Sequence, residues 1–213
     1  MPTPTNGYCS LIQLKNHIQS GGEETSLTPE DDLNLIAAID AVSRAIDYRF
    51  DNSTFYARTE TRYYTPSFGD ILFLPDDLLS ITTLKTDDDG DSVYENTWTT
   101  TDYWLEPANA LLGPVVEPYR QIRINDNQGN YTFPVGVRRS VEIVGSWGFS
   151  TAANRPPQIT QACLLWSHRV WKRKTAVFGI AGAAALGITT VVAQVGRDSD
   201  IQDLLNSVSR RGW

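Results

Sequence analysis

The chain has 213 residues, 41% of them hydrophobic and 20% charged, so it can bury a sizeable core and is not disordered as a whole. Its net charge of −7 is unevenly divided. Residues 1–154 carry ten Lys/Arg and twenty-two Asp/Glu, a net charge of −12, whereas residues 155–213 carry eight Lys/Arg and three Asp, a net charge of +5. The acidic body argues against tight non-specific binding to nucleic acid, because neutralising phosphates requires a cationic surface. The basic last quarter indicates either a second surface with a different partner or ordinary solvated charge.

The start of the chain and its cysteines indicate the compartment. MPTPTNGYCSLIQ lacks the basic start and apolar run of a secretory signal. The two cysteines, Cys9 and Cys163, lie far apart in the sequence and have no metal-like partners beside them, so they do not form a disulfide framework. We therefore expect a protein that is made and kept in a reducing cytoplasm.

Helical periodicity dominates the first fifty residues. YCSLIQLKNHIQ predicts a short helix with Leu11, Leu14 and Ile18 on one face. A longer helix follows, in which Thr28 is the cap and Pro29 takes the first helical position. Three acidic residues next to Pro29 complement the helix dipole. The apolar residues of this helix recur at steps of three and four and predict one buried stripe: Leu35, Ile39, Val42, Ile46 and Phe50.

Between residues 54 and 150 the period changes to that of β-strands. Five segments rich in β-branched and aromatic residues are separated by turn residues, which predicts about five or six strands. Asp76 and Asp77 follow Pro75 and are interpreted as a turn. In the last strand, alternation predicts one face with Val141, Ile143, Trp147 and Phe149 and the opposite face with Ser140, Glu142 and Ser146.

Helical periodicity returns at residues 155–174, with two prolines at the start of the helix. The predicted buried stripe is Ile159, Cys163, Trp166 and Val170. A basic stripe at spacing i, i+3 and i+4 consists of Arg169, Lys172 and Arg173. Residues 198–213 predict a short amphipathic helix that ends in cations.

Together these elements predict an α+β fold, in which the terminal helices form a small bundle and an antiparallel β subdomain is inserted between them. The expected boundaries are 1–53 for the N-terminal helices, 54–153 for the β insertion, 154–175 for the C-terminal bundle helix and 176–213 for an extended arm with a terminal helix.

The sequence contains no recognisable catalytic motif. GIAGAAALG has glycines but lacks the Lys-Ser/Thr of a phosphate-binding loop. His17 and His168 have no carboxylate at a ligand-like spacing, and no nucleophile elbow, H-E-x-x-H or C-x-x-C is present. We therefore expect no enzymatic activity, no cofactor and no metal.

The segment TDDDGDSVYE is the one candidate for a metal site. Asp87, Asp89 and Asp91 have the odd-number spacing that opens a calcium loop. However, Ser92 stands where an EF-hand has glycine, and Trp98 stands where it has a bidentate glutamate. The competing interpretation is a hairpin turn in which Gly90 supplies a positive φ and the aspartates stay solvated.

Residues 176–195 are uncharged and follow three consecutive cations, as at a membrane span. Their composition fits a span poorly, because three glycines, two threonines and a glutamine interrupt the segment and only eight residues are Leu, Ile, Phe or Val. Two function classes therefore stay open at this point: a membrane-anchored protein with a β ectodomain, and a calcium-dependent β binding module.

Three segments carry a family resemblance: VEIVGSWGFS, then six residues later PPQITQACLLWSHRVWKRK, then FGIAG. In the order capped acidic helix, β insertion, C-terminal helix and terminal DIQDLLNSVSRR helix, the chain resembles the head–tail connector, or adaptor, proteins of tailed bacteriophages. The resemblance spans nearly the whole chain but includes no catalytic motif. GAAALGITTVVAQV departs from it in being unusually apolar.

The resemblance implies a homo-oligomeric ring, twelve-fold in the family, beneath the portal protein of a virion assembled in the host cytoplasm. DNA passes through the lumen without specific binding, and the next connector, stopper or tail protein docks on the other face. The arm would reach the portal, and we expect its apolar and cationic residues to be the anchors. The predicted portal-binding residues are Phe178, Ile180, Leu204, Leu205, Arg210, Arg211 and Trp213, with the basic stripe as the fallback.

Overall fold

The structure, a computed structural model, describes residues 3–20, 27–112, 117–173 and 199–208. The chain forms two compact units. One consists of Met1–Arg49 together with Pro156–Trp213, and the other of Phe50–Arg155. The first, called the helical unit below, contains the four described helices. The second, called the β unit, contains a six-stranded antiparallel sheet. The predicted α+β class is therefore confirmed, with the sheet inserted between the helices of the first unit.

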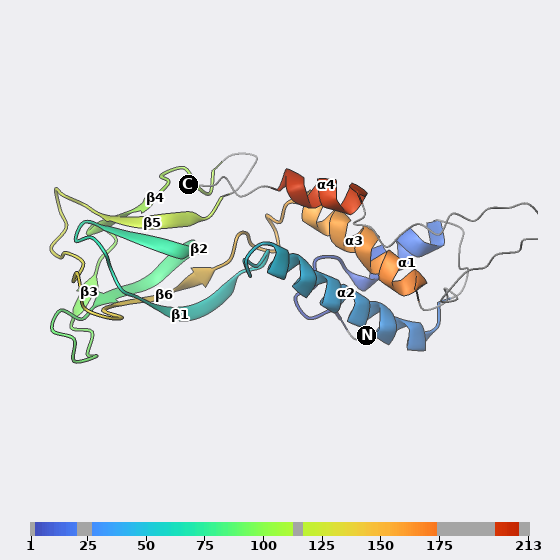
Figure 1. The fold of residues 1–213 in the computed structure, drawn as a ribbon, viewed down its shortest axis with the longest axis horizontal. Coiled ribbons are helices and arrows are strands. Elements are labelled where there is room, and N and C mark those ends of the chain that lie inside the picture. The colour runs from blue at the N-terminus through green and yellow to red at the C-terminus, as the bar shows by residue number, and fades with distance from the viewer. Residues whose placement is uncertain (1–2, 21–26, 113–116, 174–198, 209–213) are drawn as a thin grey trace, which may run out of the picture. The chain divides into compact units, whose positions relative to one another are not determined.

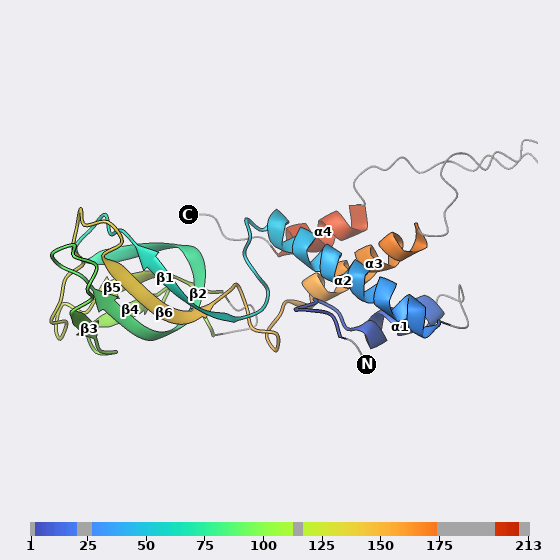
Figure 2. The same ribbon diagram turned by 90° about the horizontal axis from the view of Figure 1, so that it is seen from below.

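Four helices make up the described part of the first unit: α1 (Leu11–Ser20), α2 (Pro29–Arg49), α3 (Pro157–Lys172) and α4 (Ser199–Ser207). The third helix packs against each of the other three, and α1 also contacts α2 (Figure 1). Figure 2 shows the same four helices from below. Since α3 comes from the far end of the chain, this unit forms only when both termini come together.

The two N-terminal helices begin as the sequence predicts. Ser10 and Gln13 exchange hydrogen bonds at the start of α1, which is a capping box with glutamine at N3. At the start of α2, the Thr28 hydroxyl accepts from the Asp31 N–H, and the Asp31 carboxylate accepts from the Thr28 N–H. The predicted faces of both helices are buried, apart from Phe50, which follows the end of α2 and is half-buried.

The buried stripe of α3 differs from the predicted one. Ile159 and Cys163 are fully buried as expected, but Trp166 is only half-buried and Val170 is 36% exposed. The buried face instead continues to Ser167 and Trp171, because it runs along four-residue steps from Ile159. Because Ser167 is small and polar, it gave no hydrophobic signal, and the sequence pattern therefore predicted Val170 instead of Trp171 as the last buried residue.

The sheet consists of β1 (Arg58–Tyr64), β2 (Ile71–Thr86), β3 (Asn96–Trp98), β4 (Tyr103–Glu106), β5 (Tyr119–Ile124) and β6 (Val141–Trp147). The strand order is β1-β6-β2-β5-β4, with β3 paired to the end of β2, and every pairing is antiparallel. The long strand β2 therefore organises the sheet. Its first part pairs with β5 and its second part with β6 and β3.

The predicted turn at Asp76 and Asp77 is wrong, because both residues lie inside β2. The strand passes Pro75 where its register with β5 shifts, so the missing proline N–H interrupts no regular pair. The Asp76 carboxylate accepts a hydrogen bond from the Tyr64 hydroxyl at 2.8 Å. The Asp77 carboxylate is buried and accepts from the Ser53 hydroxyl. Asp76 thus links β2 to β1, and Asp77 links β2 to the segment before β1, so neither residue reverses the chain.

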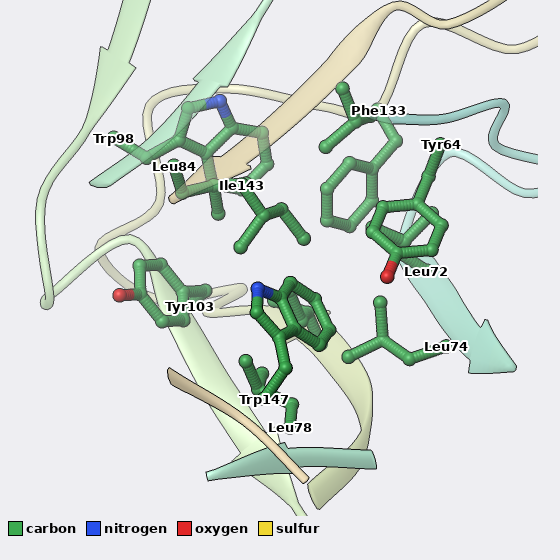
Figure 3. Packing of buried hydrophobic residues seen from close by; sticks show 12 residues of the cluster. Tyr64, Leu72, Leu74, Leu78, Leu84, Trp98, Tyr103, Phe133, Ile143 and Trp147 are labelled. Carbon is green, nitrogen blue, oxygen red and sulfur yellow. The ribbon is translucent and has the colours of Figure 1, made fainter. Parts of the chain in front are cut away.

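One apolar cluster fills the β unit, and Trp147 lies at its centre (Figure 3). Its side chain is fully buried, its indole N–H donates to the Glu60 carbonyl at 3.0 Å, and the Arg62 guanidinium lies 4.6 Å from its ring centroid. The predicted inward face of β6 is confirmed at Val141, Ile143 and Trp147. Ser140 contradicts the prediction, because it precedes the strand and is fully buried.

Replacing Trp147 by Ala should destabilise the β unit by about 3–5 kcal/mol, because the variant leaves a large cavity and an unpaired Glu60 carbonyl. The matched control is Trp104→Ala, since Trp104 is 58% exposed in the same sheet and should cost well under ~1 kcal/mol. Urea unfolding followed by circular dichroism measures both. Equal losses for the two variants would contradict this assignment of the core.

Candidate functional site

The predicted basic stripe lies on the last turn and at the end of α3. Lys172 and Arg173 are exposed. Arg169 is partly covered, and its guanidinium lies 3.8 Å from the Asp200 carboxylate at the start of α4. The three cations are therefore not equivalent. Arg169 lies against the start of α4, whereas Lys172 and Arg173 are exposed where α3 ends.

The terminal helix α4 is part of the helical unit. Leu205 is 1% exposed and Ile201 is 4% exposed, and both lie on the side of α4 that packs against α3. Asn206 accepts a hydrogen bond from Arg49 at the end of α2. Leu205, predicted as a portal anchor, is thus a core residue of its own subunit, whereas Leu204 is half-buried.

The other predicted anchors, Phe178, Ile180, Arg210, Arg211 and Trp213, lie outside the described residues. The uncharged segment 176–195 lies outside them as well. Within the described ranges, no helix combines the length and the apolar character that crossing a bilayer requires.

The acidic loop after β2 brings four carboxylates together. Asp87, Asp89, Asp91 and Glu95 each place one oxygen within 4.8 Å of the others. Gly90 has the positive φ (83°) that the hairpin interpretation requires, and the next turn position, Ser92, is also left-handed (72°). The sequence prediction that all the aspartates stay solvated is wrong for Asp87, which is 3% exposed.

The Asp87 side chain holds this loop together through hydrogen bonds from backbone N–H groups of the loop. Its two carboxylate oxygens accept from the N–H groups of Gly90 at 2.7 Å and Ser92 at 2.9 Å. Burial would raise the pKa of Asp87, but these backbone donors outweigh it and hold the pKa below its usual value. Asp89 and Asp91 each accept one further N–H of the loop. The carboxylates therefore close the turn, which is the arrangement of an Asx-type hairpin.

The outer face of the sheet carries an exposed apolar patch that the sequence did not reveal. In the pairings of β5 with β2 and β4, Leu72, Ile122 and Leu105 share the inner side. The neighbouring positions therefore point outward. There, Phe73 and Trp104 are 45% and 58% exposed. We call Phe68 and Phe73 the outer aromatic patch, because Phe68 contacts Phe73 edge-on at 5.9 Å between ring centroids. Trp104 lies on the same face of the sheet, on β4, which β5 separates from β2.

Two further contacts were hidden by sequence distance. The two histidines, His17 of α1 and His168 of α3, meet edge-to-face with their ring centroids 5.0 Å apart. The two cysteines, 154 residues apart, place their sulfurs 3.5 Å from each other in the helical unit. No local spacing signals either pair, since each depends on the packing of α3 against the N-terminal segment.

Solved structures share this fold. The chain superimposes on a chain from the virion of a native gene transfer agent (GTA) particle with a TM-score of 0.55 and 18% identity, covering 95% of this chain and 91% of that one. It also superimposes on a chain from the neck of an empty GTA particle, computed with C6 symmetry, with a TM-score of 0.53 and 17% identity, covering 84% and 86%. No protein-family model and no curated protein matches the sequence. The similarity therefore establishes the fold, and it extends over both units.

Leu205→Ala should destabilise the helical unit by about 2–5 kcal/mol, because it opens a cavity between α4 and α3. The adjacent control Leu204→Ala keeps that contact and should cost about 1 kcal/mol or less. Thermal unfolding of both variants by circular dichroism provides the comparison. If Leu204→Ala were the more damaging change, the packing face of α4 would be misassigned.

Asp87→Asn should weaken the acidic loop at pH 7, because an amide replaces the carboxylate that both N–H groups contact. A folded pKa that lies below the unfolded one contributes stability above the unfolded value, and this contribution is lost as the pH falls toward the folded value. The gap in melting temperature between wild type and Asp87→Asn should therefore narrow below about pH 4. Asp126→Asn, a change at an exposed aspartate outside this loop, is the control and should behave like wild type at pH 7 and below about pH 4. A melting temperature that rises in millimolar calcium would instead support the metal interpretation.

Proposed function

We propose that this chain is a structural head–tail connector subunit of a tailed-phage-like particle and assembles as a ring beneath the portal. The fold similarity to chains of GTA virion and neck structures carries the proposal, because it extends over 84–95% of the chain and includes both the helical unit and the inserted sheet. The neck structure was computed with six-fold symmetry, which supports a ring. The residue patterns in VEIVGSWGFS and PPQITQACLLWSHRVWKRK support the same role independently.

The charge distribution suits a channel for DNA. The acidic residues 1–154 would repel phosphates, so a lumen built from them would let DNA pass without holding it. Two cations of the sheet, Arg62 and Arg120, are paired with Asp76 and Asp77. In this proposal DNA is cargo of the ring and makes no specific contact.

Portal docking is assigned to the C-terminal part of the chain. Lys172 and Arg173 are exposed where α3 ends, directly before residues 174–198. The apolar and aromatic residues Phe178, Ile180 and Trp213, with the cations Arg210 and Arg211, would supply the anchors. Leu205 leaves this set because it is buried against α3, and Leu204 stays in it as a half-buried neighbour.

The outer aromatic patch is a candidate surface for the next connector, stopper or tail protein. Phe68, Phe73 and Trp104 are exposed on the outer face of the sheet, and the buried core of the β unit is formed without them. Aromatic side chains are over-represented among the residues that dominate binding energy. The assembled particle would therefore use the helical unit and the β unit for different neighbours.

Phe178→Ala and Trp213→Ala should each weaken docking to the portal about tenfold or more, since truncating an aromatic anchor removes ~2 kcal/mol. Gln202→Ala in α4 is the control and should leave docking unchanged. Point variants are better suited to this test than removal of residues 176–213, because α4 covers part of α3. The measurement is co-sedimentation with purified portal rings, with circular dichroism to verify folding.

Undiminished docking by folded Phe178→Ala and Trp213→Ala variants would contradict the anchor assignment. Docking that is lost in Lys172→Glu and Arg173→Glu instead would move the portal contact to the basic stripe. If the wild-type chain itself failed to sediment with portal rings, the connector role would be excluded.

A further inference from the structure

The two cysteines of the chain occupy the centre of the helical unit. Cys9 lies two residues before the start of α1, and Cys163 lies in the middle of α3. Their side chains are 4% and 0% exposed, and the two sulfurs are 3.5 Å apart. A disulfide requires about 2.05 Å between the sulfurs, so a small movement of two side chains would suffice to form one.

The segment that carries Cys9 is held in place by several contacts with α2. The Tyr8 N–H donates to the Ser43 hydroxyl at 3.0 Å, and the Tyr8 hydroxyl donates to the Asp47 carboxylate. Gly7 approaches α2 so closely that a Cβ there would lie 2.8 Å from a methyl group of Ile39. These contacts fix the backbone next to Cys9, so its sulfur stays in front of Cys163.

Polar groups surround Cys163 inside the helical unit. The hydroxyls of Ser43 and Ser167 lie 3.6 Å and 3.8 Å from its sulfur. The hydrogen bond with Cys9 is the main cause that lowers the pKa of Cys163, against the opposing effect of burial, to about 7. The lowered pKa favours the thiolate, which is the form that reacts with oxidants.

We propose that Cys9 and Cys163 form an oxidative modification site, at which a peroxide converts the pair into an intrachain disulfide that ties the N-terminal segment to α3. A peroxide is small enough to enter a helical core as it fluctuates, which larger disulfide reagents are not. The inference is independent of the proposed function, since it depends only on contacts within one subunit.

The chemistry is balanced in two steps when hydrogen peroxide is the oxidant. The Cys163 thiolate attacks one peroxide oxygen, the O–O bond breaks, hydroxide leaves, and the sulfur becomes a sulfenic acid. The Cys9 thiol then attacks this sulfur, the S–S bond forms, the S–O bond breaks, and water leaves. In sum, two thiols and one peroxide give one disulfide and two waters.

The disulfide would connect the segment before α1 to α3 and enclose the entire inserted β unit in one covalent loop. Closing a long loop restricts the unfolded chain and stabilises the folded one. A chain folded under reducing conditions would thus gain stability after it meets an oxidant, without a change of partners or fold. Disulfides persist in such oxidising surroundings.

The test uses the full chain, treated either with a stoichiometric amount of hydrogen peroxide or with a phosphine reductant. We expect the intact mass to fall by about 2 Da and peptide mapping to recover a cross-link between Cys9 and Cys163. The melting temperature should rise by several degrees and return after reduction. The variants Cys9→Ser and Cys163→Ala should show neither the mass loss nor the reversible rise.

Several results would overturn the proposal. Both thiols could stay alkylatable after peroxide treatment, the mass could rise by about 32 Da through sulfinic acid, or the chain could form intermolecular dimers. Mass spectrometry of the wild-type chain distinguishes these products directly, so the test does not depend on whether either cysteine variant folds.

Discussion

The packing of α3 against the N-terminal helices is the contact on which the rest of the structure depends. Each helix is amphipathic, and helices in proteins owe most of their stability to the packing of such a face, so each needs the others to cover its apolar stripe. The contact joins segments more than one hundred residues apart, and α4 then adds Leu205 to the same unit. The positions of Lys172 and Arg173, and with them the contacts proposed for the C-terminal end, depend on the packing of α3 against α1 and α2.

The inserted β unit has a core of its own and can therefore carry a separate surface. Its buried cluster surrounds Trp147, while Asp76 and Asp77 accept hydrogen bonds from the hydroxyls of Tyr64 and Ser53. Because that core is complete without Phe73 and Trp104, their exposure is not needed for folding. Exposed aromatic side chains of this kind are typical of protein contacts. The proposed connector role requires contacts with two neighbours, and the two units would provide a separate surface for each.

Helix starts, the α+β class and most strands could be predicted from the sequence, because capping residues and periodicity are local signals. The prediction failed where a distant contact decides the outcome. Asp77 follows a proline as a turn residue would, but it is buried and accepts a hydrogen bond from Ser53. Val170 was predicted to be buried, but Trp171 is buried in its place. The exposed face of Trp104 follows from strand register, which the sequence does not specify. The docking residues beyond position 173 remain a prediction.

The most direct test of the connector role is the mass of the purified chain, measured by light scattering alone and after mixing with purified portal rings. We predict a monomer alone, since the helical stripes are covered within one subunit, and a complex with the portal that carries a fixed, symmetric number of copies. A portal ring whose mass is unchanged by an excess of the folded chain would contradict the connector role.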